Sequence, residues 1–571
     1  MRVRHAHVRA TIAAIAVLFL MSIASPAAGR QGLVQRAPRA STGSTAHVRD
    51  AKPMPGLAPV RSDALTRALD RGRITEARYA LARASSLFHL RTVRARYGAV
   101  RVADPRSATM ILRDLVLRLD DLGPVGQARA RAILARPTDG AADPQEDGYS
   151  VPEATPYCTT NACIHYVTST PDAPDPTDAN ADGVPDYVET AAQTVEQVWS
   201  TEVTAYGYRA PKSDLTSVNN GGSALIDVYL AQIGNEGLYG YCTTDDPNAM
   251  SGSGYEFYDF SAYCVVDNDF SPDEFTSGAS GVQALQVTAA HEFFHAVQFA
   301  YDAAEDSWFM ESTATWMEDE VFDDVNDNQQ YFPDSPIGTP DVPLDYNRGF
   351  GVYGDWIFIR YLSEAVGDPS IIRGAWERAD ASPTGSDAYS IKALDGSLDG
   401  FGGDFRSAFA DFAMVNDAPV TFYSEGADYP YPPPERRVKV TARNGGAVDR
   451  STLDHLTNRY VWFIPGKGVR SSARLYVSMD GPASKSGTEG SVVVFFSSGQ
   501  VRFFPLGIAN DGSADIVVPF GKGKVDEVDL VLTNASTRRG ACWQDPRWEF
   551  ACAAFPKDDG MSFAYGATLL Q

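Results

Sequence analysis

The stretch His291-Glu292-Phe293-Phe294-His295 lies in a run, from Val282 to Tyr301, that contains no proline and no glycine. This run predicts one continuous helix, which Ser280-Gly281 would open. Two histidines four residues apart lie on one helix face, one turn apart, where both imidazoles can bind a single zinc ion. Glu292 lies between them and is placed to take a proton from a zinc-bound water. The sequence therefore predicts a zinc centre on this helix.

A third ligand follows where such a centre needs one. The segment from Ser307 to Glu318 has apolar residues at helical spacing, with Ser307 as its N-cap. A second helix, antiparallel to the first, would bring Glu311 over His291 and His295. Two imidazoles and one carboxylate leave a fourth tetrahedral position for water, which is typical of a catalytic zinc site. The alternative, a helix with two unrelated histidines, leaves Glu311 without a role.

These motifs resemble those of the gluzincin metallopeptidases, in which His-Glu-x-x-His is followed by Trp-x-x-Glu-Ser-x-Ala-x-x-x-Glu. Four further motifs are similar to those of a family of large secreted bacterial zinc metalloproteases: Cys163-Ile-His-Tyr, Asp182-Gly-Val-Pro-Asp-Tyr-Val-Glu, Ile226-Asp-Val-Tyr-Leu and Tyr353-Gly-Asp-Trp-Ile-Phe-Ile-Arg-Tyr-Leu. The similarity covers most of residues 60–430 and, more loosely, the C-terminal part.

The resemblance implies an α+β fold with a gluzincin-like metallopeptidase domain, in which a strand at 222–232 belongs to a sheet beside the zinc helix. The better-studied gluzincins often have Asp four residues after the glutamate ligand. Here that position is Thr315. Glu318, seven residues on and on the same helical face, is expected to orient the histidines instead.

The chain begins with basic residues, an apolar run over 12–24, and small residues up to Gly29. This pattern predicts a signal peptide over 1–29 and a secreted, extracellular protein. A membrane anchor is the alternative, but the run is too short to span a bilayer comfortably, so we expect no membrane span. The net charge of −24 argues against nucleic-acid partners.

Charge divides the chain unevenly. Residues 1–140 hold 24 Lys+Arg and 9 Asp+Glu, a balance of +15, and the rest carries −39. We expect a disordered linker at 30–61, a helical N-terminal segment at 62–140, and a metallopeptidase domain at 141–431. The helical segment is either a small domain without catalytic role or a pro-segment that docks its basic face on the acidic enzyme. In the second case, a cut would fall between about Arg136 and Tyr149.

A second metal site is predicted in the loop that begins at Asp178. Oxygen donors occupy loop positions 1, 3, 5, 9 and 12, with Gly183 at position 6 for the turn and a backbone carbonyl expected at position 7. A helix over 187–199 would follow, whereas the Pro-rich stretch before the loop cannot be helical. The alternative is a polar turn without metal. The predicted structural Ca2+ ligands are Asp178, Asn180, Asp182, Val184, Asp186 and Glu189.

From about residue 432 the sequence reads as seven short strands separated by Gly, Ser and Asn turns, which predicts a β-sandwich over 432–571. Such a domain could bind a polymer or a surface, or only stabilise the enzyme. Secretion favours disulfides, and pairing between sequence neighbours closes three short loops: Cys158/Cys163, Cys242/Cys264 and Cys542/Cys552.

We therefore expect a zinc-dependent endopeptidase that acts on a peptide or protein substrate, with Glu292 as general base. The developing oxyanion needs a donor besides zinc. Tyr353 is the first candidate, then Tyr346, with His165 and His455 behind them. The alternative is a calcium-stabilised adhesion or binding protein with a vestigial zinc site, although a purely structural zinc site has no use for Glu292.

Overall fold

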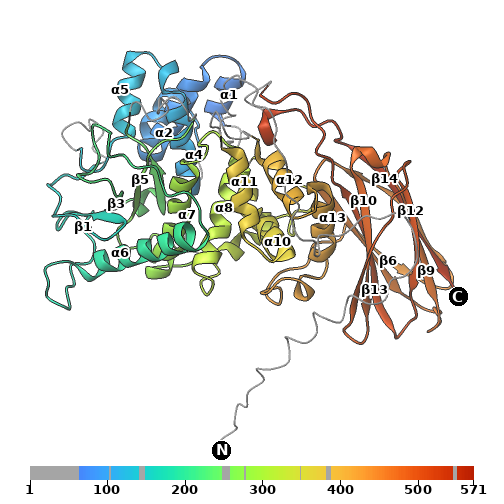
Figure 1. Cartoon of the computed structure of the whole chain (residues 1–571). Helices are drawn as coiled ribbons and strands as arrows, with labels where there is room; N and C mark the ends of the chain where they lie inside the picture. Colours follow the sequence, from blue (N-terminus) through green and yellow to red (C-terminus); the bar gives the residue numbers. More distant parts are fainter. Residues whose placement is uncertain are drawn as a thin grey trace, which may run out of the picture.

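The computed structural model describes residues 63–101, 105–139, 148–246, 258–275, 278–347, 349–380, 388–543 and 549–571. The predicted signal peptide and linker lie outside these ranges. Helices and sheets occur together, as predicted, with a mixed body followed by two β-sheets at the C-terminal end (Figure 1). Within these residues no helix has the length and apolar character needed to cross a membrane.

The N-terminal segment is helical, as predicted, with a break between two of its helices at His89. Asp63 caps the first helix, because its carboxylate accepts the N–H groups of Leu65 and Thr66. The helices are α1 (Ala64–Asp70), α2 (Glu76–Phe88), α3 (Leu90–Tyr97), α4 (Ala108–Leu117) and α5 (Pro124–Ile133).

This segment shares its core with the rest of the molecule. Every residue of α4 is buried, and Met110, Ile111 and Leu112 belong to the same apolar cluster as Phe293 of the zinc helix. At the end of the segment, the buried Arg136 guanidinium pairs with Asp214, Asp227 and Asp245. The docking is therefore largely apolar, with buried ion pairs at its margin, rather than a contact of exposed charges.

A five-stranded sheet lies beside the helix predicted to bind zinc, in the order β1-β2-β3-β5-β4. Strands β2, β3 and β5 run parallel, and β4 pairs antiparallel to β5 at the edge. The strand expected within 222–232 is β3. The strands are β1 (Tyr157–Cys158), β2 (Ala162–His165), β3 (Ile226–Ala231), β4 (Gly240–Thr243) and β5 (Tyr263–Asp267).

Helices complete the body between this sheet and the C-terminal sheets (Figure 1). A turn at Asp355 separates the helices on either side of it, and Gly354 lies against the backbone of Ser335, where a Cβ atom would be 2.7 Å from the Ser335 Cα. The elements are α6 (Asp186–Trp199), the π-helix η3 (Ser200–Ala205), α7 (Val282–Gln298), α8 (Ser307–Val321), η5 (Asp327–Asp334), α9 (Gly351–Gly354), α10 (Trp356–Val366), α11 (Ser370–Ala379), α12 (Ser390–Gly400) and α13 (Phe405–Asn416).

The C-terminal region is a sandwich of two sheets, ordered β11-β10-β13-β8-β6 and β12-β9-β14-β7, which share one apolar core. All seven expected strands are present, and β6 and β7 are additional. The strands are β6 (Arg436–Val440), β7 (Gly446–Leu453), β8 (Thr457–Pro465), β9 (Arg474–Asp480), β10 (Thr488–Phe496), β11 (Val501–Pro505), β12 (Ser513–Pro519), β13 (Val525–Asn534) and β14 (Met561–Leu570).

Two features join the sandwich to the body. Residues of α13 pack on β13 and β10, and the Tyr460 hydroxyl donates to the carbonyl of Ala413. The buried His455 bridges Asp345 of the body and Asp559 of the sandwich, at 2.8 and 2.6 Å. All three predicted disulfides are present.

Candidate metal centre and cleft

Helices α7 and α8 bring the three predicted zinc ligands together. His291 Nε2 lies 3.1 Å from His295 Nε2 and 3.2 Å from Glu311 Oε2, and His295 Nε2 lies 3.5 Å from the same Glu311 oxygen. Zinc bonds of about 2.0–2.2 Å separate neighbouring tetrahedral ligands by about 3.3–3.6 Å. All three side chains are buried, so the donor set fits a zinc ion with one further coordination position.

A second layer of hydrogen bonds fixes both imidazoles. His291 Nδ1 donates to Glu318 Oε1 at 2.7 Å, the role expected for Glu318. His295 Nδ1 donates to Gln298 Oε1 at 2.7 Å, and the Gln298 amide donates in turn to the carbonyl of Met310. These bonds leave both Nε2 atoms directed at the centre, which is the arrangement that metal-binding histidines require.

The electrostatics of this centre favour a cation. Burial alone would raise the pKa of Glu311, but hydrogen bonds from His291 and His295 hold it at about 2. Burial raises the pKa of Glu318 to about 7, against the hydrogen bond from His291. The pKa of His291 is raised well above its usual value by its bonds to both glutamates, although burial opposes the shift. Metal binding must therefore displace protons from this centre.

Tyr353 and Glu292 line the cleft in front of His291. The Tyr353 hydroxyl donates to Glu311 Oε1 at 3.2 Å, so this residue contacts the ligand set. The other tyrosine and histidine candidates lie elsewhere. Tyr346 packs on Phe550, and His165 and His455 make ion pairs with acidic side chains that do not line the cleft.

The start of α4 fills this cleft. The Thr109 hydroxyl donates to Glu292 Oε2 at 2.7 Å and accepts the N–H of Cys242, on the edge strand β4, at 2.9 Å. One residue earlier than α4, Ser107 Oγ lies 3.1 Å from the Tyr353 hydroxyl. The space left beside Glu292 is about 40 Å³, room for about one water, whereas pockets for small molecules span about 300–1,000 Å³. The helical segment therefore blocks the predicted catalytic base.

Arg106 continues this contact on the other side of the cleft. Its guanidinium lies over the rings of Tyr239, Tyr331 and Phe350, at 5.0, 5.2 and 6.0 Å from their centroids. Its Nη2 donates to Gln330 Oε1 at 2.9 Å and lies 3.4 Å from the Tyr239 hydroxyl. We call these four surrounding side chains, Tyr239, Gln330, Tyr331 and Phe350, the arginine cage.

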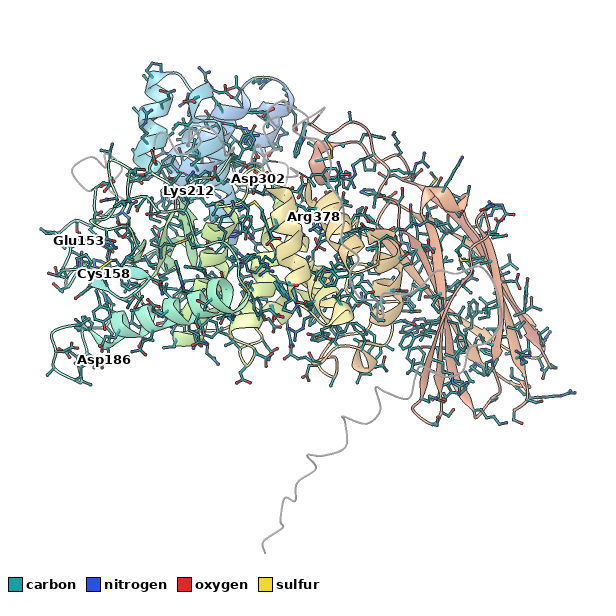
Figure 2. All side chains as sticks on the ribbon, viewed as in Figure 1. Glu153, Cys158, Asp186, Lys212, Asp302 and Arg378 are labelled. Atoms are coloured by element: carbon teal, nitrogen blue, oxygen red, sulfur yellow. A yellow bond between two sulfur atoms is a disulfide. The ribbon has the colours of Figure 1, made fainter. Side chains whose placement is uncertain are left out.

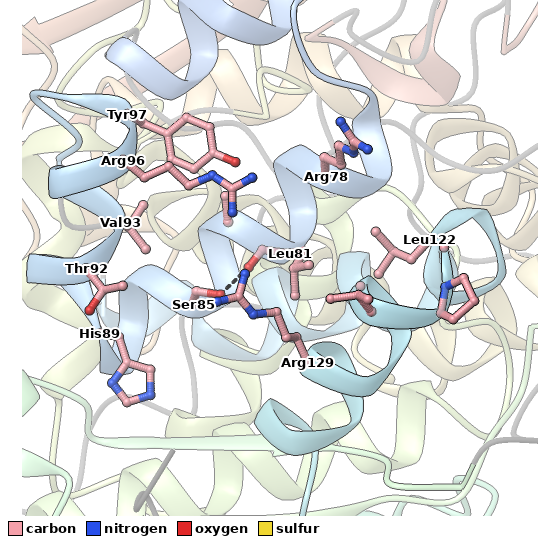
Figure 3. A pocket seen from close by; sticks show the side chains of 15 residues that line it. Arg78, Leu81, Ser85, His89, Thr92, Val93, Arg96, Tyr97, Leu122 and Arg129 are labelled. Carbon is pink, nitrogen blue, oxygen red and sulfur yellow. Dashed lines mark hydrogen bonds between the residues drawn. The ribbon is translucent and has the colours of Figure 1, made fainter. Parts of the chain in front are cut away.

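A larger cavity lies away from the metal centre, among the helices of the N-terminal segment. It has a volume of about 560 Å³ and is lined by residues of α2, α3 and α5 (Figure 3). Three arginines, Arg78, Arg96 and Arg129, are on its lining, together with apolar side chains such as Leu81 and Val93. None of its described lining residues belongs to the zinc ligands or the cleft.

The loop predicted to bind calcium lies at the outer tip of the molecule, opposite the sandwich, as the position of Asp186 at the start of α6 shows (Figure 2). Its own backbone closes it, because Gly183 N–H donates to Asp178 Oδ2 at 2.9 Å and Asp182 N–H to Asn180 Oδ1 at 3.0 Å. The Asn180 amide reaches Glu189 Oε2 at 3.2 Å. Two other clusters of described acidic residues have carboxylate oxygens close enough together to hold an ion. They are Asp267/Asp269/Glu274 and Asp319/Asp323/Glu425.

The residues around the predicted ligands and base that sequence reasoning missed include Gln298, Arg106, Ser107 and Thr109. Gln298 follows His295 by three residues on the same helix, and that spacing could have identified it. The other three come from a segment some 180 residues away, and no local pattern links them to Glu292.

Comparisons with known proteins add little. No protein-family model matches the chain, and no curated protein is similar to it. Among solved structures, the pre-peptidase C-terminal domain of a collagenase from Bacillus anthracis aligns with 12% identity and a TM-score of 0.14, over 25% of this chain and all of that domain. A TM-score this low supports no conclusion about fold or function.

Proposed function

We propose that the protein is a secreted zinc-dependent endopeptidase of the gluzincin type. The observation that carries the proposal is the convergence of His291, His295 and Glu311 within 3.1–3.5 Å of one another, beside Glu292 in the same cleft. A structural zinc site has four protein ligands, whereas this donor set supplies three and leaves room for a reactant.

Each side chain then has a defined task. A zinc ion bound here would act as a Lewis acid on a peptide carbonyl and would acidify water at neutral pH. Glu292 accepts the proton from the attacking water and returns it to the leaving amine. Tyr353 stands beside Glu311, where its hydroxyl could donate to the developing oxyanion. Glu318 and Gln298 hold the imidazoles in the required tautomer. The loop at Asp178 is proposed to bind a structural Ca2+, and the sandwich to serve a polymer or surface ligand.

Metal analysis and hydrolysis of a peptide library test this proposal together. His291→Ala and Glu311→Ala should each lose bound zinc, because two ligands do not hold the ion against dilution. Glu292→Gln should keep zinc and the fold but lose hydrolysis by orders of magnitude, because only the base is removed. Full zinc in both ligand variants, or wild-type turnover by Glu292→Gln, would exclude the assignment.

A further inference from the structure

The arginine cage surrounds a cation in the manner of a binding site. Three aromatic rings lie within 6.0 Å of the Arg106 guanidinium, and ring faces attract cations through their quadrupoles. The Gln330 carbonyl supplies a hydrogen-bond acceptor at 2.9 Å. Tyr331 is only 5% exposed and stacks on Tyr353 at 5.1 Å, so the cage is held in shape by the ring that contacts the zinc ligand Glu311.

The charges of the cleft favour the same kind of side chain. Glu292, Glu318 and Asp327 line it, and Arg106 is the single arginine or lysine among its described lining residues. A cationic side chain in the cage therefore meets both aromatic faces and a negative potential, while an acidic side chain would be repelled.

The residues that follow Arg106 contact other parts of the same cleft. From Arg106 in the cage, the chain passes Ser107 at Tyr353 and reaches Thr109 at Glu292 and at the edge strand β4. Arg106 and Ser107, in the 3-10 turn just before α4, and Thr109, in the first turn of α4, thus contact the arginine cage, Tyr353 and the predicted base Glu292 of one cleft. An arginine that served only to attach the segment would not need to be placed beside the catalytic groups.

We propose that the arginine cage is the subsite that selects a cationic side chain of the peptide substrate, and that Arg106 fills it in the intact chain as an intramolecular stand-in. This inference rests on the proposed peptidase function, because it takes the molecule that the cage binds to be a peptide substrate. The helical segment then inhibits the enzyme by binding as a substrate does, and substrates with arginine or lysine compete with it for the cage.

The first experiment measures binding to the full-length chain, with N-acetyl-arginine amide as probe and its uncharged isostere, N-acetyl-citrulline amide, as control. In Arg106→Ala the cage is free, so this variant should bind the arginine probe about tenfold or more tighter than the citrulline probe. The wild-type chain should bind the arginine probe at least about tenfold more weakly than the variant. Arg129→Ala, which removes an arginine outside the cleft, should behave as wild type.

Arg106→Ser, which also empties the cage, guards against a loss of fold that is specific to Arg106→Ala. Adding Tyr331→Leu to either variant should abolish the preference for the arginine probe. Equal affinity for the two probes in a folded Arg106 variant would overturn the proposal, and Arg106 would then only attach the segment.

Hydrolysis separates this inference from the proposed function. A panel of peptides with arginine or citrulline at each position is incubated with the Arg106 variants. Cleavage with a preference for arginine at one position supports both ideas. Cleavage without any such preference overturns the cage and leaves the peptidase, whereas preferential binding of the arginine probe without hydrolysis of any peptide removes the peptidase and leaves the cage.

Discussion

Replacing Thr109 with valine tests whether the helical segment is held on the catalytic base. The substitution exchanges the hydroxyl for a methyl group of similar size and removes two buried hydrogen bonds, to Glu292 Oε2 at 2.7 Å and from Cys242 N–H at 2.9 Å. A hydrogen bond to a charged group contributes about 1.5–3 kcal/mol, and an unsatisfied buried donor costs about 1–3 kcal/mol. We expect a loss of about 3 kcal/mol, which increases opening of the segment roughly 100-fold.

Amide hydrogen exchange measured by mass spectrometry reports this opening directly, because each helix exchanges according to the free energy that exposes it. Peptides from α4 should lose about two orders of magnitude of protection in Thr109→Val, while α13 should not change. Thr109→Ser is the matched control: it keeps the hydroxyl and loses one methyl group, so about 1 kcal/mol is expected.

Equal rates of amide exchange of α4 peptides in Thr109→Val and Thr109→Ser would contradict this prediction. The hydroxyl would then not hold the segment on Glu292, and the block of the cleft would depend on apolar contacts alone. If the segment does control access, hydrolysis by the full-length chain should rise in Thr109→Val and remain near the wild-type level in Thr109→Ser.

Three further predictions concern metals and pH. Calcium should raise the melting temperature of the wild-type protein but not of the Asp182→Ala/Glu189→Ala double variant, because an ion bound only by the folded state stabilises it; a calcium-free protein that melts alike with and without the ion would contradict the loop assignment. Glu318→Gln should weaken zinc affinity about 10- to 100-fold, measured by competition with a chelator, because the hydrogen bond that orients His291 loses its charge; unchanged affinity would leave Glu318 without this role. The pKa of His455 is raised to about 9 by its two aspartate partners, although burial opposes the shift, so the protonated form stabilises the fold fully below pH about 6.5, and this contribution, on the order of 3 kcal/mol, is lost as the pH rises through about 9. Urea unfolding from pH 6 to 10 should show this decline in the wild type and a flatter profile in His455→Gln, and parallel profiles would refute it.

Sequence patterns predicted the features that depend on residue spacing within a single helix or strand. The four-residue spacing of His291 and His295 places them on one face of any helix, and the spacing from Glu311 to Glu318 places those two on one face of the next. Both relations hold in the structure. The strands of the sandwich were predicted where apolar residues dominate, whereas β7, over Gly446–Leu453, was missed because exposed polar residues fill its middle.

Contacts between distant segments could not be predicted in this way. The basic charge of the helical segment suggested docking on an acidic surface, but the segment docks through buried apolar residues such as Met110 and Ile111 and through the hydroxyl of Thr109. Neither charge balance nor helical periodicity distinguishes a threonine that faces solvent from one that reaches the predicted catalytic base. Likewise, nothing in the sequence around these two tyrosines shows that Tyr353 contacts Glu311 and that Tyr346 does not.

The ion pairs of Arg136 determine what a proteolytic cut would achieve. The predicted cut lies among residues 140–147, outside the described part of the chain, between Arg136 and Tyr149, whose hydroxyl donates to the carbonyls of His165 and Leu230. A cut there leaves both anchors in place. Departure of the segment would leave Asp214, Asp227 and the half-buried Asp245 without their shared cation, at a cost of about 3–5 kcal/mol for one uncompensated buried charge. The cleaved protein should therefore elute from a size-exclusion column as a single species. Its cleft should stay blocked after cleavage until acid neutralises the aspartates or a competing ligand displaces the segment.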